Sequence, residues 1–188
     1  LRRQRQMCIR DSDYISRIGR QAREASRSMA RASTAAKNAV LERIAELLLE
    51  QEADIRAANE ADLEAACAEG LDEVFLDRLT ISAVGLRAMA EGCRQIAALE
   101  DPVGTVTDLA FRPSGIQVGR MRVPLGVLAM IYESRPNVTI DAAALAVKSG
   151  NAIILRGGHE ALRSNTVLWE LVGRALAEKG LPARAVQL

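Results

Sequence analysis

Two short apolar runs with a helical segment between them constrain the fold of this chain more than any other feature. The runs are residues 127–131 (Val-Leu-Ala-Met-Ile) and residues 152–155 (Ala-Ile-Ile-Leu). Uninterrupted apolar runs of this length are typical of parallel strands that are covered on both faces. A helical pattern follows each run, and the order β-α-β-α predicts a right-handed crossover in a parallel sheet.

The helices around these strands have predictable ends. Thr139 is the expected N-cap of the helix between the two strands, and Gly150 occupies the position after its end where a left-handed residue is favoured. A second helix is predicted over residues 161–179, closed by Gly180. Residues 185–188 look like the start of a third strand. A sheet that stopped there would leave a hydrophobic edge open, so we expect the chain to be a fragment.

The part upstream of the sheet is predicted to be helical and then to form a hairpin. Residues 13–102 have the pattern of four or five successive helices, as the apolar stripe Val40, Ile44, Leu47 and Leu48 illustrates. Residues 103–123 are predicted to form a β-hairpin that turns at residues 113–115. Its second strand alternates apolar and polar residues, which suits either a solvated face or a subunit contact.

Composition excludes several classes of function. The 25 basic and 24 acidic residues leave a net charge of +1, which argues against nucleic acid or an anionic membrane as a partner and favours a small molecule. Cys8, Cys67 and Cys93 form no CxxC pair, and with the single His159 they predict no metal site. Charges interrupt every apolar stretch before the length of a spanning helix. We expect a soluble, cytoplasmic protein whose Arg-rich residues 1–12 form a disordered leader.

Two loops lie at the carboxyl ends of the predicted strands and are therefore expected to face one crevice. They are residues 132–137 (Tyr-Glu-Ser-Arg-Pro-Asn) and residues 156–160 (Arg-Gly-Gly-His-Glu). In the second loop, Gly157 and Gly158 would let the backbone approach a ligand, and Arg156 is a donor suited to phosphate or ribose oxygens. The alternative is a strand-to-helix turn that uses glycine for its backbone freedom.

In the first loop, Pro136 restricts Arg135 to extended conformations and so fixes how Asn137 enters the crevice. The side-chain amide of Asn137 is a candidate donor to a developing oxyanion. The alternative is that Asn137 caps the following helix. His159 is a candidate phosphate ligand or acid, against the simpler interpretation of an exposed loop residue.

Two longer stretches carry a family resemblance: residues 122–139 (Arg-Val-Pro-Leu-Gly-Val-Leu-Ala-Met-Ile-Tyr-Glu-Ser-Arg-Pro-Asn-Val-Thr) and residues 148–158 (Lys-Ser-Gly-Asn-Ala-Ile-Ile-Leu-Arg-Gly-Gly). In these stretches the chain resembles the γ-glutamyl phosphate reductase family, also called glutamate-5-semialdehyde dehydrogenases, within the aldehyde dehydrogenase superfamily. The resemblance extends upstream to residues 59–62, 76–79 and 101–104, whereas residues 1–12 have no expected counterpart.

The resemblance implies an α/β fold: N-terminal helices (13–102), an oligomerisation hairpin (103–123), and an incomplete Rossmann-like cofactor domain (124–188) without the later catalytic domain. It also implies roles for single residues. Asn137 matches the oxyanion-stabilising Asn, and Arg156, Gly157 and Gly158 match the position that holds the adenosine ribose and phosphate. Glu133 and Ser134 would line the nicotinamide side, and Arg135 would help to hold the anionic substrate.

The implied activity is the NADPH-dependent reduction of γ-glutamyl phosphate to glutamate 5-semialdehyde and phosphate in L-proline biosynthesis, by a homo-oligomer. A cysteine thiolate attacks the substrate in such enzymes, and none of Cys8, Cys67 and Cys93 matches its position. We therefore expect this chain alone to be inactive. Preference for NADPH over NADH follows the resemblance only. The alternatives are another oxidoreductase of the aldehyde dehydrogenase superfamily and a non-catalytic interaction module.

Overall fold

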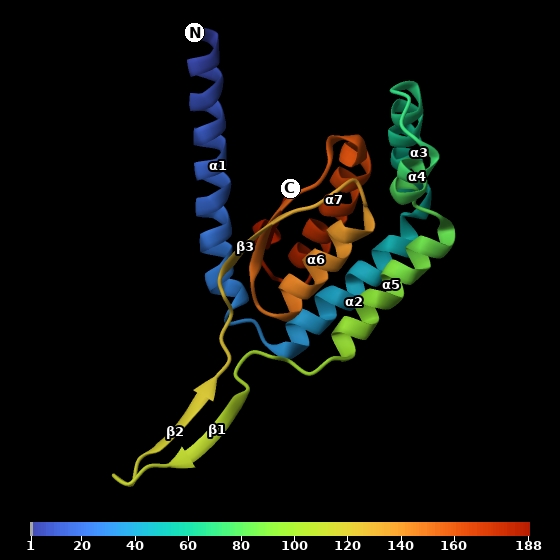
Figure 1. Ribbon diagram of the computed structural model, residues 1–188. Helices are drawn as coiled ribbons and strands as arrows, with labels where there is room; N and C mark the ends of the chain where they lie inside the picture. Colours follow the sequence, from blue (N-terminus) through green and yellow to red (C-terminus); the bar gives the residue numbers. More distant parts are fainter. Residues whose placement is uncertain (1) are drawn as a thin grey trace.

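The computed structural model describes residues 2–188, with side chains from Asp13 onward, and folds them into a helical body with two small sheets (Figure 1). The α-helices are α1 (Arg2–Met29), α2 (Thr34–Glu50), α3 (Glu52–Ala68), α4 (Glu73–Leu79), α5 (Ala83–Ala98), α6 (Asn137–Lys148) and α7 (Leu162–Glu178). The strands are β1 (Val106–Phe111), β2 (Gln117–Met121), β3 (Val127–Ile131), β4 (Ala152–Arg156) and β5 (Val186–Gln187). Short 3₁₀ turns, η1 (His159–Ala161) and η2 (Ala183–Ala185), precede α7 and β5.

The parallel sheet confirms the β-α-β-α prediction. Its strand order is β3-β4-β5, with α6 and α7 as the crossover connections. The register runs from Val127 opposite Ala152 to Ile131 opposite Arg156, so β3 and β4 end side by side. β5 pairs with β4 in parallel, as expected of a third strand.

The burial of β3 differs from the prediction. All five of its residues are half-buried or exposed, and Ile131 is 85% exposed, whereas most of β4 is buried. The reason is position in the sheet: β4 lies between two strands and packs against α1 and α6, while β3 is an edge strand. An apolar run reports how hydrophobic a strand is, not which neighbours cover it.

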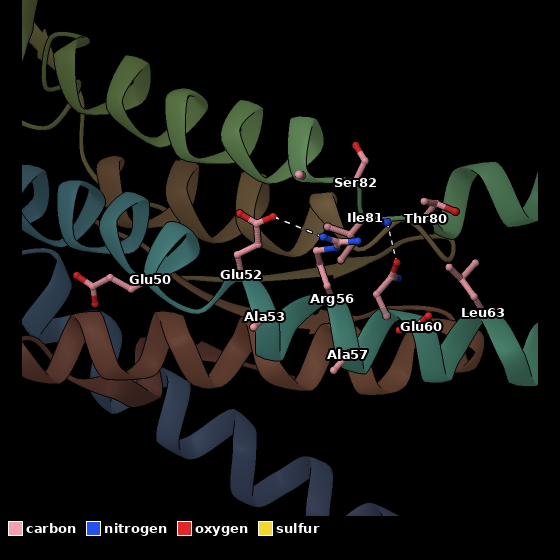
Figure 2. A pocket seen from close by; sticks show the side chains of 12 residues that line it. Glu50, Glu52, Ala53, Arg56, Ala57, Glu60, Leu63, Thr80, Ile81 and Ser82 are labelled. Atoms are coloured by element: carbon pink, nitrogen blue, oxygen red, sulfur yellow. Dashed lines mark hydrogen bonds and ion pairs between the residues drawn. The ribbon is translucent and has the colours of Figure 1, made fainter.

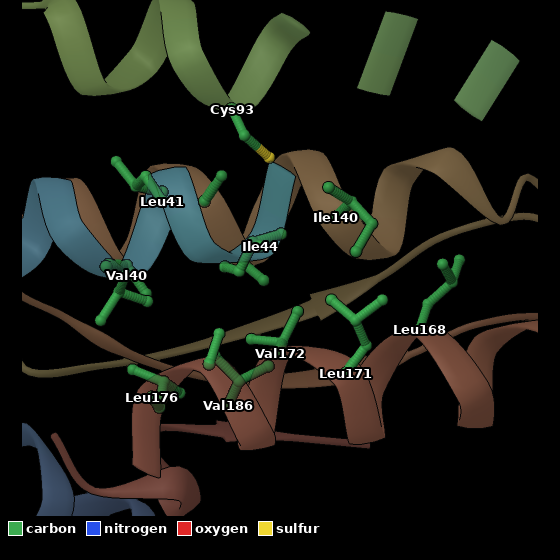
Figure 3. Packing of buried hydrophobic residues seen from close by; sticks show 14 of the residues in the cluster. Val40, Leu41, Ile44, Cys93, Ile140, Leu168, Leu171, Val172, Leu176 and Val186 are labelled. Atoms are coloured by element: carbon green, nitrogen blue, oxygen red, sulfur yellow. The ribbon is translucent and has the colours of Figure 1, made fainter. Parts of the chain in front are cut away.

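The hydrophobic core lies among α1, α2, α5, α6, α7 and the sheet. Figure 3 shows Val40 and Ile44 of α2 on one side and Val172 and Leu176 of α7 on the other. The predicted α2 stripe is buried along its full length. Burying one such side chain contributes about 1.5–3 kcal/mol, so this interface is a main source of the stability of the body.

Helix ends agree with the sequence in most places and differ at one. Ser33 caps α2 by accepting a hydrogen bond from the backbone N–H of Ala36 (3.2 Å), and Gly150 follows α6 with a φ of 70°. Thr139, however, is not the N-cap of α6. Pro136 precedes the helix with its φ already at −59°, so α6 begins at Asn137 and Thr139 is buried within the first turn.

The hairpin of β1 and β2 extends away from the helical body (Figure 1), and every residue of its two strands is exposed. Asp101 fixes its base. The carboxylate of Asp101 forms an ion pair with the buried Lys37, accepts from Thr34 Oγ1 (2.6 Å) and accepts from the N–H of Val103 (3.0 Å). The hairpin is thereby tied to the start of α2.

The N-terminal segment also differs from expectation. We predicted a disordered leader over residues 1–12, but α1 begins at Arg2 and continues to Met29 without a break. Arg, Gln and Met are good helix formers, and neither Gly nor Pro occurs before Gly19, so local propensity favours the helix. Within the described residues, no helix combines the length and the apolar character needed to cross a membrane.

Candidate functional site

The two predicted loops lie against each other at the carboxyl ends of β3 and β4. The backbone N–H of Tyr132 donates to the carbonyl oxygen of Arg156 (3.0 Å), which extends the strand pairing by one step. Beyond it, the hydroxyl of Ser134 donates to a carboxylate oxygen of Glu160. The sequence predicted this meeting of the loops from strand order alone.

Buried polar side chains support the loops from below. The hydroxyls of Tyr132 and Thr139 are hydrogen-bonded (2.6 Å), and Thr139 Oγ1 donates to Asn165 Oδ1 of α7 (2.9 Å). Burial raises the pKa of Tyr132, against the opposing effect of the Thr139 hydrogen bond. Sequence reasoning gave none of these three residues a supporting role, because the contact joins segments that only the crossover brings together.

A second buried link holds the start of α7. Asp62 of α3 accepts hydrogen bonds from the backbone N–H and the hydroxyl of Ser164, both at 2.8 Å. Asn59 Nδ2 donates to the same hydroxyl (3.1 Å), and Asn59 Oδ1 accepts from the N–H of Ile81 (2.7 Å). A carboxylate at a helix N-terminus satisfies backbone donors that the helix itself leaves unpaired. The segment that follows Gly158 is therefore fixed by α3.

The glycine pair is required by close packing and not by backbone freedom. Gly158 has a φ of −60° and a ψ of 150°, which any residue adopts, and Gly157 is not among the glycines with positive φ. A Cβ on Gly158 would overlap Ser134 Oγ and lie 2.6 Å from Glu160 Oε2. One on Gly157 would lie 2.4 Å from Asn165 Nδ2 of α7 and 3.1 Å from the Tyr132 ring. Gly158 therefore lets the two loops pack closely, and Gly157 lets its loop pack against α7 and Tyr132.

Replacing Gly158 with alanine is expected to lower the free energy of unfolding by about 1–3 kcal/mol, because the added methyl group forces the loops apart. Chemical denaturation measures the loss. Gly92→Ala is the matched control: Gly92 lies within α5 with nothing within 4 Å of its Cβ position. That control should gain roughly 0.5–1 kcal/mol from helix propensity. Equal effects of the two substitutions would show that the loop contact contributes nothing.

Five of the candidate residues line one pocket of about 420 Å³, here called the loop pocket. They are Glu133, Ser134, Arg135, Gly158 and His159; the pocket is completed by Phe75, Arg78 and Glu160. The hydrogen bond from Ser134 lowers the pKa of Glu160, so its carboxylate is ionised at neutral pH. The pocket therefore offers cationic donors beside two carboxylates, a set that suits the phosphates and hydroxyls of a nucleotide. Phe75 and Arg78 come from α4, and sequence reasoning gave them no role.

Asn137 does not line the loop pocket. It lies at the start of α6 in a second pocket of about 300 Å³, here called the α6 pocket. The α6 pocket is lined by Thr80, Ile81, Gly85, Ala88, Met89, Pro136, Asn137 and Asp141. The expected single crevice is therefore two neighbouring sites of one loop, because the turn at Pro136 separates Asn137 from residues 133–135. Arg156 lines neither pocket; its side chain donates to the carbonyl oxygen of Gly157 (2.9 Å) and is otherwise exposed.

A larger pocket lies apart from all predicted site residues. It has a volume of about 860 Å³ and is lined mainly by α3 and by residues 80–82, which precede α5. Figure 2 shows Glu52 paired with Arg56 there, at 3.8 Å, beside Glu60 and Ser82. Three glutamates and one arginine line this open surface, which is typical of a solvated helix face.

The two cysteines with described side chains are unlike catalytic nucleophiles. Cys93 is buried in the core, and burial raises the pKa of its thiol to about 12, so it stays protonated at neutral pH. Cys67 is exposed on α3 and lines none of the three pockets above. Cys8 lies outside the residues whose side chains are described.

Comparisons with solved structures show two reductases of similar fold. The γ-glutamyl phosphate reductase of Thermotoga maritima is 40% identical, with a TM-score of 0.88 over 91% of this chain and 41% of that one. The γ-glutamyl phosphate reductase of Saccharomyces cerevisiae is 33% identical, with a TM-score of 0.87 over 92% of this chain and 45% of that one. The chain thus spans less than half the length of either protein.

More distant structures share the fold alone. A probable aldehyde dehydrogenase of Listeria monocytogenes is 15% identical, with a TM-score of 0.73 over 95% of this chain and 37% of that one. The model of the aldehyde dehydrogenase family matches residues 7–188, and so begins inside the segment that was expected to have no counterpart. Because this match covers nearly its whole length, the chain belongs to the aldehyde dehydrogenase family.

Proposed function

We propose that this chain is the cofactor-binding part of an NADPH-dependent γ-glutamyl phosphate reductase, which forms glutamate 5-semialdehyde and phosphate for proline biosynthesis. The observation that supports it most is the contact of the two loops at the ends of β3 and β4, since ligands of open α/β sheets bind at that edge. The two reductases that resemble the chain at 40% and 33% identity make γ-glutamyl phosphate the favoured substrate.

The loop pocket is the proposed cofactor site. Gly158 and Ser134 form its wall, Glu133 faces the nicotinamide side, and Arg156 with Gly157 holds the adenosine ribose and phosphate at the exposed rim. Arg78 and Arg135 bring positive charge to this pocket, beside the carboxylates of Glu133 and Glu160, and His159 adds a ring nitrogen that can hydrogen-bond a phosphate. A ligand with several phosphates suits such a donor set, and 420 Å³ holds part of a dinucleotide while the remainder lies along the rim. When bound, NADPH would supply the hydride.

In this proposal the residues of the chain bind and orient the cofactor and the substrate. The nucleophilic cysteine is expected outside these 188 residues. Asn137 would donate a side-chain N–H to the acyl oxygen of the substrate, where negative charge develops. Arg135 is retained as a weaker proposal for holding the anionic substrate, because it faces the loop pocket and not the pocket of Asn137. We expect the 188-residue chain to bind cofactor without turnover.

Titration of the purified chain with NADPH, followed by the change in cofactor fluorescence, tests the proposal. Saturable binding is expected, and Arg156→Ala should weaken it about tenfold or more, since a charge-assisted hydrogen bond contributes about 1.5–3 kcal/mol. Arg87→Ala, which removes an exposed arginine of α5, is the matched control and should leave the affinity unchanged. NADH titrated in parallel tests the preference for the 2′-phosphate.

Two results would contradict the proposal. One is no binding of either nucleotide by a folded chain. The other is turnover of γ-glutamyl phosphate by the 188-residue chain itself, because the proposal assigns no nucleophile to this chain.

The exposed hairpin of β1 and β2 is further proposed to contact another subunit, and cross-linking from residues 106–121 would test that contact.

A further inference from the structure

The α6 pocket contains a single charged side chain, that of Asp141, among the residues that line it. Asp141 lies one helical turn after Asn137, so both side chains are on the same face of α6. Asn137 Nδ2 donates to Asp141 Oδ2 at 3.3 Å. The amide proposed to bind the acyl oxygen is therefore held beside a carboxylate.

The surroundings leave this carboxylate without a cation. Ile81, Ala88, Met89 and Pro136 make most of the pocket wall apolar. Among the described residues, none of the ion pairs involves Asp141. Burial raises the pKa of Asp141, and the hydrogen bond from Asn137 opposes that rise only in part. Asp141 is nevertheless solvent-accessible at the open side of this apolar wall. An accessible carboxylate with no cation beside it is stabilised by a ligand that brings a positive charge.

We propose that Asp141 binds the α-ammonium group of the glutamyl substrate and selects for amino-acid substrates. This inference rests on the proposed function. γ-Glutamyl phosphate has one cationic group and two anionic ones, so a carboxylate in its binding pocket repels the substrate unless it faces the ammonium. When Asp141 pairs with the ammonium, its carboxylate favours substrates that carry an amino group and disfavours anionic substrates that lack one.

The geometry lets one short molecule reach both side chains. The acyl oxygen and the ammonium lie at opposite ends of an aliphatic chain. Asn137 Nδ2 and Asp141 Oδ2 lie 3.3 Å apart, and each can form a hydrogen bond of about 2.9 Å to the substrate. These lengths add only in a straight line, so their total is the greatest separation at which the acyl oxygen and the ammonium nitrogen can both bind. The opposite face of α6 is buried through Ala142, Ala143 and Ala144, which holds the helix and both side chains in place.

The test uses the full-length protein and follows the reverse of the proposed reaction, in which NADP⁺ oxidises an aldehyde in the presence of phosphate. It compares two aldehydes as substrates. The substrates are glutamate 5-semialdehyde and 5-oxopentanoate, which lacks the amino group. Asp141→Asn keeps the shape and an acceptor for Asn137 but removes the charge. It should lower kcat/KM for glutamate 5-semialdehyde about 10–100-fold and leave that for 5-oxopentanoate within about threefold, because an ionic hydrogen bond contributes about 1.5–3 kcal/mol.

Asp54→Asn, an exposed carboxylate on α3, is the matched control and should change neither value. An equal loss on both aldehydes in Asp141→Asn would assign Asp141 a structural role and overturn the inference. Equal use of both aldehydes by the unsubstituted protein would overturn it as well. These two results leave the proposed function intact, whereas no turnover of either aldehyde by the unsubstituted protein removes the proposed function and this inference together.

Discussion

Asp101→Ala is expected to lower the free energy of unfolding of the chain by about 3 kcal/mol, because it leaves a buried ammonium without its counter-ion. The side chain of Lys37 is only 1% exposed and that of Asp101 is 14% exposed. Removing one partner of such a pair costs far more than the pair itself contributes, since the remaining charge stays desolvated. Urea denaturation with a two-state fit measures the difference.

A second buried ammonium strengthens this expectation. Lys148 Nζ donates to Asn38 Oδ1 and to the carbonyl oxygen of Ala97, both at 2.8 Å. Burial lowers the pKa of Lys148, the charge of Asp101 opposes that effect, and the charge of Lys37 adds to it. Without Asp101, both lysines lose the carboxylate that compensates them.

Two controls separate burial from charge pairing in general. Glu52→Ala breaks the exposed pair with Arg56 and should cost less than about 1 kcal/mol, as surface pairs do. Adding Lys37→Met to Asp101→Ala removes the stranded charge and should restore most of the lost stability. If Asp101→Ala costs no more than Glu52→Ala, the buried pair does not hold the base of the hairpin.

The same pair predicts an acid-sensitive step. Burial raises the pKa of Asp101, but the contacts with Lys37, Thr34 and Val103 outweigh it and place the pKa below its ordinary value of 3.8. A carboxyl group with a depressed folded pKa contributes its stability above the unfolded pKa and loses it as the pH falls through the folded pKa. The stability difference between the unsubstituted chain and Asp101→Ala should therefore shrink as the pH falls below about 4.

The local sequence was sufficient to predict the order of the elements. The predicted strand over residues 127–131 coincides with β3 at both ends, because five adjacent apolar residues between Gly126 and a polar loop favour a short strand. Ser33 and Ser82 cap α2 and α5, because a hydroxyl before a helix satisfies a backbone N–H of the first turn. Strand order then placed both loops at one edge of the sheet.

What the sequence did not predict depends on contacts between distant segments. The exposure of Ile131 follows from the edge position of β3, which no local pattern reports. Arg78 lines the loop pocket because α4 packs against α3, which also contacts the η1 turn after Gly158. Thr139 looked like a helix cap, but Pro136 starts the helix earlier, and the threonine hydroxyl bonds to Asn165 instead. The division between the loop pocket and the α6 pocket likewise comes from the backbone path after Arg135.

If Asn137 is the proposed oxyanion donor, Asn137→Ala is expected to lower kcat of the proposed reductase activity about 10²–10³-fold with little change in the KM for NADPH, because one preformed donor of this kind contributes that much to catalysis. Stability should hardly change, since Asn137 is exposed and, among the side chains that the structure describes, its amide bonds only to Asp141, at 3.3 Å. The assay follows NADPH oxidation with γ-glutamyl phosphate, and thermal unfolding of the same samples confirms that the variant is folded.

Gln95→Ala provides the matched control for that substitution. Gln95 Nε2 donates to Glu91 Oε1 at 3.3 Å, four residues away on α5, so the control removes an exposed amide–carboxylate pair of the same length and spacing. It should leave kcat unchanged. A loss below about tenfold in Asn137→Ala would instead favour the simple role of a residue at the start of α6, because a donor aimed at the developing charge is worth more than that. A large loss confined to Asn137 assigns the start of α6, and with it the α6 pocket, to the chemical step.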